Sequence, residues 1–190
     1  MAPVPKGHQP VTLQSARGIK LANAAPKLVG KVLRAAALPV LLKVTNGAQL
    51  GSIPGGGTSM PSAAVRAFIA RGASRCTSVA VLFADLRAAF YSVLTEEVIG
   101  EVMTATTRAA ALQHLGFSAA QEREFTRRFI EGQSLLEKGG LAPEWRAMIT
   151  DWHRAPYFTV RGGRHHVATR LGAVPGEPLA DLAFSLCYEI

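Results

Sequence analysis

The pattern of hydrophobic and polar positions predicts a helix-rich chain with a few short strands. The first helix is expected to begin near Ala24, with Asn23 as its N-cap, and Pro39 is expected to kink or restart it. One side of this helix is apolar and the opposite side is basic. The apolar side consists of Leu28, Val29, Val32, Leu33, Ala35 and Ala36, and the basic side of Lys27, Lys31 and Arg34.

Later helices are marked by their capping and stop signals. A second helix is predicted over residues 58–71, with Val65, Phe68 and Ile69 facing inward. Ser118-x-x-Gln121 is a capping box that should open a helix to about residue 138, ended by Gly139-Gly140.

Strands are predicted in two places. Residues 157–160 and 165–170 flank a glycine-containing turn, as a β-hairpin requires. The apolar run 78–84 has strand length and ends on Asp85, and a helix is expected from there to about residue 104. The predicted fold class is therefore α+β (mixed α/β), with a small, mainly antiparallel sheet.

Composition narrows the protein class. The chain has 190 residues and is 48% hydrophobic, yet it lacks the uncharged run of about 18 residues that a membrane-spanning helix needs. The N-terminus has no apolar core of the secretory type, so we expect an intracellular protein of the nucleus or cytoplasm that is not secreted. Cys76 and Cys187 have no metal-ligand spacing.

Charge points to a polyanionic partner. The net charge is +8, and the first 45 residues carry no acidic residue. Their basic residues are Lys6, Arg17, Lys20, Lys27, Lys31, Arg34 and Lys43. A helix face that is basic only because it is solvated would give the same pattern, so charge alone leaves both interpretations open.

Asp85 is the first candidate for a catalytic or metal-binding residue. An acid at the end of a buried strand must be hydrogen-bonded, paired or bound to a cation, because an unpaired buried charge is very costly. A helix cap and a metal ligand are both compatible with this position.

Two segments together resemble motifs A and B of reverse transcriptases, closest to the non-LTR retroelement type. Residues 79–93, VAVLFADLRAAFYSV, resemble motif A, and residues 171–184, LGAVPGEPLADLAF, resemble motif B. Upstream, residues 46–59, NGAQLGSIPGGGTS, resemble the Gln-x-Gly-Phe-x-x-Gly-x-x-Thr element of the fingers. Residues 17–21, RGIKL, resemble the family's Arg-Pro-Ile-x-Leu segment.

This resemblance covers most of residues 16–190 and implies an organisation along the chain. Residues 1–15 are expected to be a flexible Pro-rich lead-in, 16–76 a basic fingers-like region, and 77–94 the palm strand with motif A. Residues 95–155 are then a helical insertion, and 156–190 hold the hairpin and motif B of an incomplete palm.

The resemblance also implies site residues. Asp85 would bind the catalytic Mg²⁺ or Mn²⁺, and Leu86 would offer its backbone carbonyl to the second ion. Phe90 would stack under the nucleotide sugar, and Pro175 and Gly176 would lie beside the nucleotide, with Asp85 and residues 174–179 facing one cleft. The partners would be an RNA template, a DNA primer and dNTPs. Arg17, Lys20, Lys27, Lys31 and Arg34 would contact the nucleic acid.

Two departures from the family pattern limit the activity expected. Pro175 stands where the family has Gln, and the aromatic-x-Asp-Asp element that supplies the other catalytic acids is absent from the 190 residues. One carboxylate cannot hold two metal ions, so these residues alone are not expected to polymerise. A non-catalytic nucleic-acid-binding module with the same fold is the alternative, and an unrelated α/β enzyme using Asp85 is a third.

Overall fold

The computed structural model describes residues 2–5, 16–19, 21–45, 49–86, 89–100, 103–154, 156–160, 164–169 and 172–187. The helices are α1 (Ala24–Val44), α2 (Ser59–Ser74), the 3₁₀ helix η1 (Ala89–Ser92), α3 (Thr95–Ile99), α4 (Ala105–His114), α5 (Ala119–Glu131), α6 (Leu135–Lys138), α7 (Pro143–Arg154) and α8 (Ala180–Cys187). The strands are β1 (Ala2–Pro5), β2 (Ala16–Ile19), β3 (Tyr157–Thr159) and β4 (His166–Ala168).

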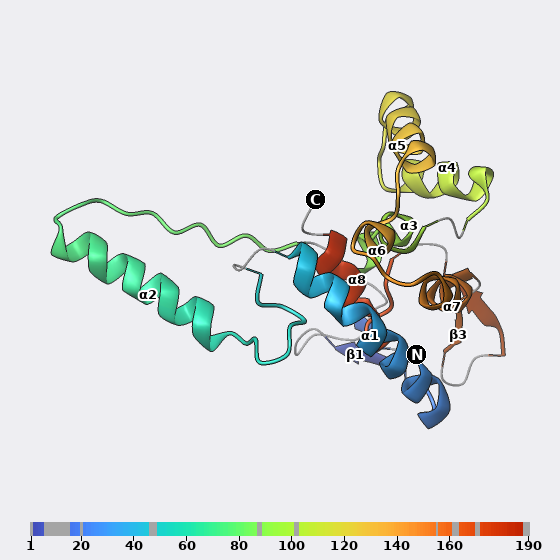
Figure 1. Cartoon of the computed structure of the whole chain (residues 1–190), viewed down its shortest axis with the longest axis horizontal. Helices are drawn as coiled ribbons and strands as arrows, with labels where there is room; N and C mark the ends of the chain where they lie inside the picture. Colours follow the sequence, from blue (N-terminus) through green and yellow to red (C-terminus); the bar gives the residue numbers. More distant parts are fainter. Residues whose placement is uncertain are drawn as a thin grey trace.

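The core lies where α1, α3, α6, α7 and α8 meet, and Figure 1 shows these helices gathered in one body. Burial of apolar side chains is the main favourable contribution to such a core. Each helix contributes fully buried side chains: Leu33, Ala37 and Leu41 from α1, Val98 from α3, Leu136 from α6, Ile149 from α7, and Leu182 and Leu186 from α8.

The strands form two separate antiparallel pairs, β1 with β2 and β3 with β4. The helix-rich α+β class and the predicted hairpin at β3–β4 are confirmed, although no larger sheet occurs among the described residues. Ala2–Pro5, in the region expected to be a flexible lead-in, pair with Ala16–Ile19 as an antiparallel hairpin.

The helix ends that were predicted from strong local signals are confirmed. The Ser118 hydroxyl and the Gln121 side chain form the predicted capping box at the start of α5, and Gly139-Gly140 follows the end of α6, with Gly140 at φ 81°. The single helix predicted over 118–138 is instead two helices. Gly132 ends α5 with an extended backbone, and the Ser134 hydroxyl accepts from the Glu137 N–H to cap α6.

Helix α1 begins at Ala24 as predicted, but its buried face matches the predicted one only in part. Leu28 and Val32, on the predicted apolar side, are 65% and 47% exposed, whereas Leu33, on the same predicted side, and Leu41 are buried against α7 and α8. Apolar residues surround much of this helix, so the packing partner decides which side is covered. The helix continues through Pro39 without the expected restart, and the kink there stays a prediction.

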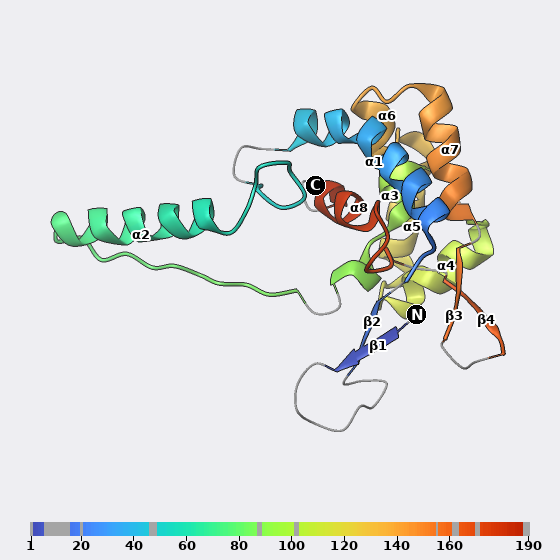
Figure 2. The same ribbon diagram turned by 90° about the horizontal axis from the view of Figure 1, so that it is seen from below.

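Helix α2 and the segment that follows it project from the body (Figures 1 and 2). Phe68 and Ile69 were expected to face inward and are 50% and 46% exposed. The segment returns along the end of the helix, since a Cβ on Gly72 would meet Val79 Cγ1 at 2.4 Å. A side chain at residue 72 would therefore have to displace Val79.

Candidate nucleic-acid interface

The basic side of α1 faces the start of α8. Lys27, Lys31 and Arg34 are spaced by four and three residues, so they share one side of the helix. Gly30 lies between them against Pro178, and a Cβ at Gly30 would come within 2.9 Å of the Pro178 ring. Glycine therefore allows α1 to approach the turn that leads into α8.

An open groove of about 690 Å³ lies between these two elements. Its α1 wall presents three cations, and its other wall is the turn before α8, where Gly176 has φ 93°. The complete lining is Lys27, Lys31, Arg34, Ala35, Leu38, Gly176, Glu177, Pro178 and Asp181. Three of the predicted nucleic-acid-binding residues and one predicted nucleotide-binding residue thus share one groove, although about 140 residues of chain separate them.

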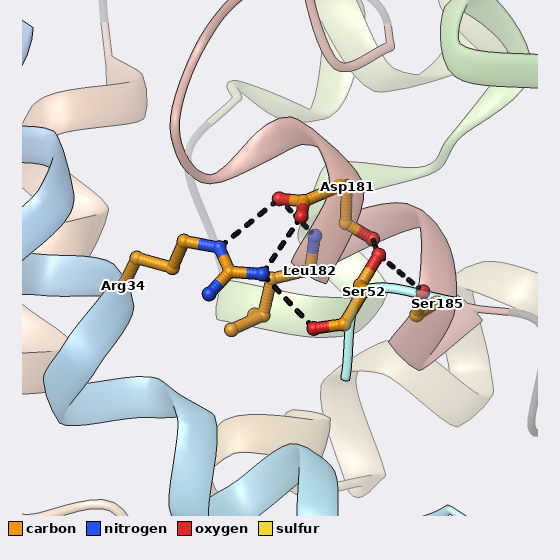
Figure 3. Close-up of polar contacts among 5 residues, drawn as sticks. All are labelled: Arg34, Ser52, Asp181, Leu182 and Ser185. Carbon is orange, nitrogen blue, oxygen red and sulfur yellow. Dashed lines mark hydrogen bonds and ion pairs between the residues drawn. The ribbon is translucent and has the colours of Figure 1, made fainter. Parts of the chain in front are cut away.

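Arg34 is held within the protein by a polar network (Figure 3). Its Nε and Nη2 donate to the two carboxylate oxygens of Asp181 at 3.3 and 2.8 Å, and Nη2 also donates to the Ser52 carbonyl at 2.9 Å. The Ser52 hydroxyl donates to the Asp181 carbonyl, and Ser185 donates to that hydroxyl. The hydrogen bonds that Arg34 donates to the Asp181 carboxylate raise the pKa of Arg34 above its usual value.

Unlike Arg34, Lys27 and Lys31 are available to contact a ligand. Both are exposed, and within the described part of the chain neither forms an ion pair. The acids of the same groove already have partners: Asp181 is paired with Arg34, and Glu177 accepts from Trp152 Nε1 at 2.9 Å. The contact with Trp152 leaves Glu177 half-buried.

The acid-free part of the sequence extends well beyond the first 45 residues. Residues 1–84 hold ten of the 21 Lys and Arg residues and none of the 13 acids, and Asp85 is the first acid of the chain. The remaining 106 residues are slightly acidic. The lysine side of the groove therefore belongs to a strongly cationic half of the chain, which favours a polyanionic ligand.

The predicted palm strand is not formed. Residues 77–86 are extended without a strand partner in the described structure, and Leu82 and Phe83 are 90% and 83% exposed. Asp85 and Leu86 are exposed in the same segment. A strand needs a neighbour for its backbone N–H and C=O groups, and none of the described segments supplies one here. The helix expected after Asp85 is replaced by the short η1 and α3.

The second half of the motif A segment does contact the motif B segment. The Ala173 N–H donates to the Phe90 carbonyl at 2.6 Å, and the Gly172 N–H donates to the Val93 carbonyl at 3.1 Å. The Phe90 ring packs on Phe184 of α8, with ring centroids 5.2 Å apart. These hydrogen bonds join two segments that lie about eighty residues apart in the sequence, but Phe90 packs against the core cluster and does not line the groove.

The remaining predicted site residues are only partly placed. Pro175 is half-buried in the turn before Gly176 and is not among the residues that line the groove. Arg17 lies in β2, where its backbone pairs with Val4. Lys20 lies outside the described residues.

A two-metal site does not fit the residues that are placed. Asp85 supplies the right donor, a carboxylate, but it is exposed and does not line the groove beside Gly176. Across the described ranges, no group of three or more His, Cys, Asp or Glu side chains is arranged to hold a metal ion. We therefore derive no catalytic step from a metal ion in this chain.

The sequence interpretation missed the partners of Arg34. Asp181 and Ser52 lie 147 and 18 residues away from it, and no local spacing rule joins them. Asp181 stands among apolar residues in the sequence. Its position in the first turn of α8 was the only local signal, because an acid there is favoured by the helix dipole.

Comparison of the chain with protein-family models, with curated proteins and with solved structures finds no match. Among the described helices, none combines the length and the apolar character needed to cross a bilayer.

Proposed function

We propose that this chain binds nucleic acid as part of a reverse-transcriptase-like polymerase, with Lys27 and Lys31 contacting backbone phosphates. One observation carries the proposal: these exposed lysines and Gly176 line one groove. A cationic helix face beside a glycine turn allows a phosphate backbone to approach protein backbone closely, while the lysines provide sequence-independent attraction. The ligand would be an RNA template with its DNA primer.

The polymerase class is supported by the order of the motif-like segments and by the contact between two of them. The hydrogen bonds of residues 172 and 173 to residues 90 and 93 bring the motif B segment beside the motif A segment. Under this proposal Gly176 lies near the incoming dNTP, and Mg²⁺ or Mn²⁺ acts only where further carboxylates join Asp85. The protein would work in the nucleus or cytoplasm, where RNA and dNTPs are present.

The binding proposal is tested by the salt dependence of affinity for a labelled RNA–DNA hybrid. Each lost phosphate contact should lower the slope of log K against log salt by about 0.9, so Lys27→Ala with Lys31→Ala should flatten it by about 2. Arg127→Ala with Arg128→Ala is a matched control, because it removes the same charge from α5, where both arginines are paired with Glu124. Equal slopes for the two double variants would refute the proposal.

A non-catalytic binding module is the second candidate. It is favoured by the position of Asp85, exposed on an extended segment and away from the groove lining. An engineered chain with an aromatic-x-Asp-Asp hairpin fused after Ile190 separates the two candidates. Mg²⁺- or Mn²⁺-dependent dNTP incorporation that Asp85→Ala abolishes would support the polymerase. Salt-sensitive binding without incorporation would support the module.

A further inference from the structure

The β3–β4 hairpin stands in the longest acid-free stretch of the second half of the chain. No Asp or Glu occurs over residues 152–176. The same stretch carries four arginines and three histidines: Arg154, Arg161, Arg164, Arg170, His153, His165 and His166. Arg154 is paired with Asp151 on α7, whereas Arg164, just before β4, is exposed. This cationic stretch is separate from the lysines of α1.

One face of the hairpin is uncovered. In the antiparallel register Thr159 is opposite His166 and Tyr157 is opposite Ala168, so the side chains of these four residues share a face. All four are exposed, and Tyr157 is 62% exposed. Phe158, on the other face, is half-buried. Figure 2 shows β3 and β4 at the edge of the molecule.

The exposed face presents an aromatic platform in a fixed position. Tyr157 and His166 contact edge to face, with ring centroids 5.2 Å apart and planes at 82°. The base of the hairpin is closed by the Thr169 N–H and hydroxyl, which both donate to the Pro156 carbonyl at 2.9 Å. Arg164 and His165, which directly precede β4, are exposed. A solvent-exposed aromatic ring in contact with a histidine, with an exposed arginine two residues before that histidine and no acid nearby in sequence, is the combination that stacks bases and attracts phosphates.

We propose that the β3–β4 hairpin is a contact site for single-stranded nucleic acid, with Tyr157 stacking on a base and Arg164 contacting a phosphate. This inference rests on the proposed nucleic-acid binding but concerns residues that do not line the groove. Single strands are favoured over duplexes because the faces of paired bases are already stacked and cannot cover the Tyr157 ring.

The test is fluorescence anisotropy of labelled oligouridylate RNA with the full chain and its variants. Tyr157→Ala should weaken binding roughly 5- to 100-fold, as expected for the loss of one stacked base, whereas Tyr157→Phe should keep the affinity. Arg164→Ala should weaken binding and lower the salt slope by about 0.7, the value for one single-strand phosphate. Arg128→Ala removes the same charge from an ion pair on α5 and should have no effect. Circular dichroism melts verify that each variant is folded.

The outcomes separate this inference from the proposed function. If Tyr157→Ala and Arg164→Ala bind like the wild type while the Lys27 and Lys31 double variant binds weakly, the hairpin inference fails and the groove remains. If the wild-type chain binds neither oligouridylate nor the RNA–DNA hybrid, both proposals fail. If Tyr157→Ala weakens duplex RNA binding as much as single-strand binding, stacking on Tyr157 is refuted.

Discussion

The Arg34 guanidinium and the Asp181 carboxylate form a two-point ion pair that joins α1 to α8 across 147 residues of sequence. The pair is part-buried, with the two side chains 25% and 41% exposed. It also holds the residue 49–57 loop in place, because Arg34 and Asp181 both hydrogen-bond to Ser52. Ser52 has φ 62°, a backbone conformation that non-glycine residues adopt only when their surroundings fix it.

Replacing Arg34 should therefore destabilise the fold as well as change the groove. Arg34→Ala leaves Asp181 and the Ser52 carbonyl without their charged donor, and the expected loss is about 1–2 kcal/mol, since water can reach this site. Arg34→Lys should lose less, because it keeps the charge but not the planar fork. Urea unfolding measures both. Arg128→Ala is the control, and an Arg34→Ala variant as stable as that control would contradict the prediction.

Glu96 and Arg108 form a buried ion pair whose loss should destabilise the fold more than the loss of the Arg34–Asp181 pair. Arg108 Nε donates to Glu96 at 2.6 Å, and the two side chains are only 2% and 5% exposed. Glu96 also accepts from the Met103 N–H at 2.7 Å. Glu96→Ala should cost about 3–5 kcal/mol, because it leaves a buried guanidinium without its carboxylate. The apolar pair Glu96→Leu with Arg108→Met should recover much of this loss in urea unfolding. A double variant no more stable than Glu96→Ala would show that the unpaired charge of Arg108 does not cause the loss of stability.

Gly172 should be intolerant of any side chain. Its φ is 77°, and a Cβ would lie 2.5 Å from Tyr91 Cα and 2.7 Å from the Phe90 carbonyl oxygen. Gly116 is a matched control, because its φ is 86° but nothing lies within 4 Å of its Cβ position. Gly116→Ala should cost only the backbone strain, about 1–2 kcal/mol. Gly172→Ala should cost clearly more and loosen the contact between the two motif-like segments. Equal thermal shifts would contradict this.

The elements predicted correctly from sequence depend on short-range signals. The Ser118 capping box, the Gly139-Gly140 stop and the β3–β4 hairpin are each decided within a few residues. The buried face of α1 is different. Leu28 and Leu33 are equally apolar, and only the positions of α7 and α8 determine that Leu33 is covered and Leu28 is not.

The candidate site also has a part that local sequence predicts and a part that only the tertiary fold determines. The basic side of α1 follows from residue spacing, so Lys27, Lys31 and Arg34 were predicted together. The partnership of Arg34 with Asp181 depends on how α8 docks, which no local pattern encodes. The strand expected over residues 78–84 fails because strand formation needs a neighbouring strand, however favourable its own sequence.

Ionisation of the Cys187 thiol should lower the stability of the fold at alkaline pH. Burial raises the pKa of its thiol from 9.0 to about 12. Above pH 9 the unfolded chain loses a thiol proton that the folded chain still holds, so the free energy of unfolding should decrease as pH rises toward 12. Cys187→Ala removes this titration and should flatten the alkaline limb of urea unfolding relative to the wild type. Identical alkaline slopes for the two proteins would contradict the assignment.

The extended segment after α2 should make the chain prone to association. Leu82 and Phe83 are 90% and 83% exposed within a β-forming run that has no strand partner in the described structure. Unpaired backbone groups flanked by apolar side chains template intermolecular pairing. Leu82→Glu with Phe83→Glu should therefore raise the concentration at which light scattering begins, since like charges on neighbouring copies repel. Leu42→Glu, at another exposed leucine, should have a smaller effect. A wild-type chain that stays monomeric and melts in one sharp two-state transition would refute the prediction, and would mean that the segment is satisfied within the single chain.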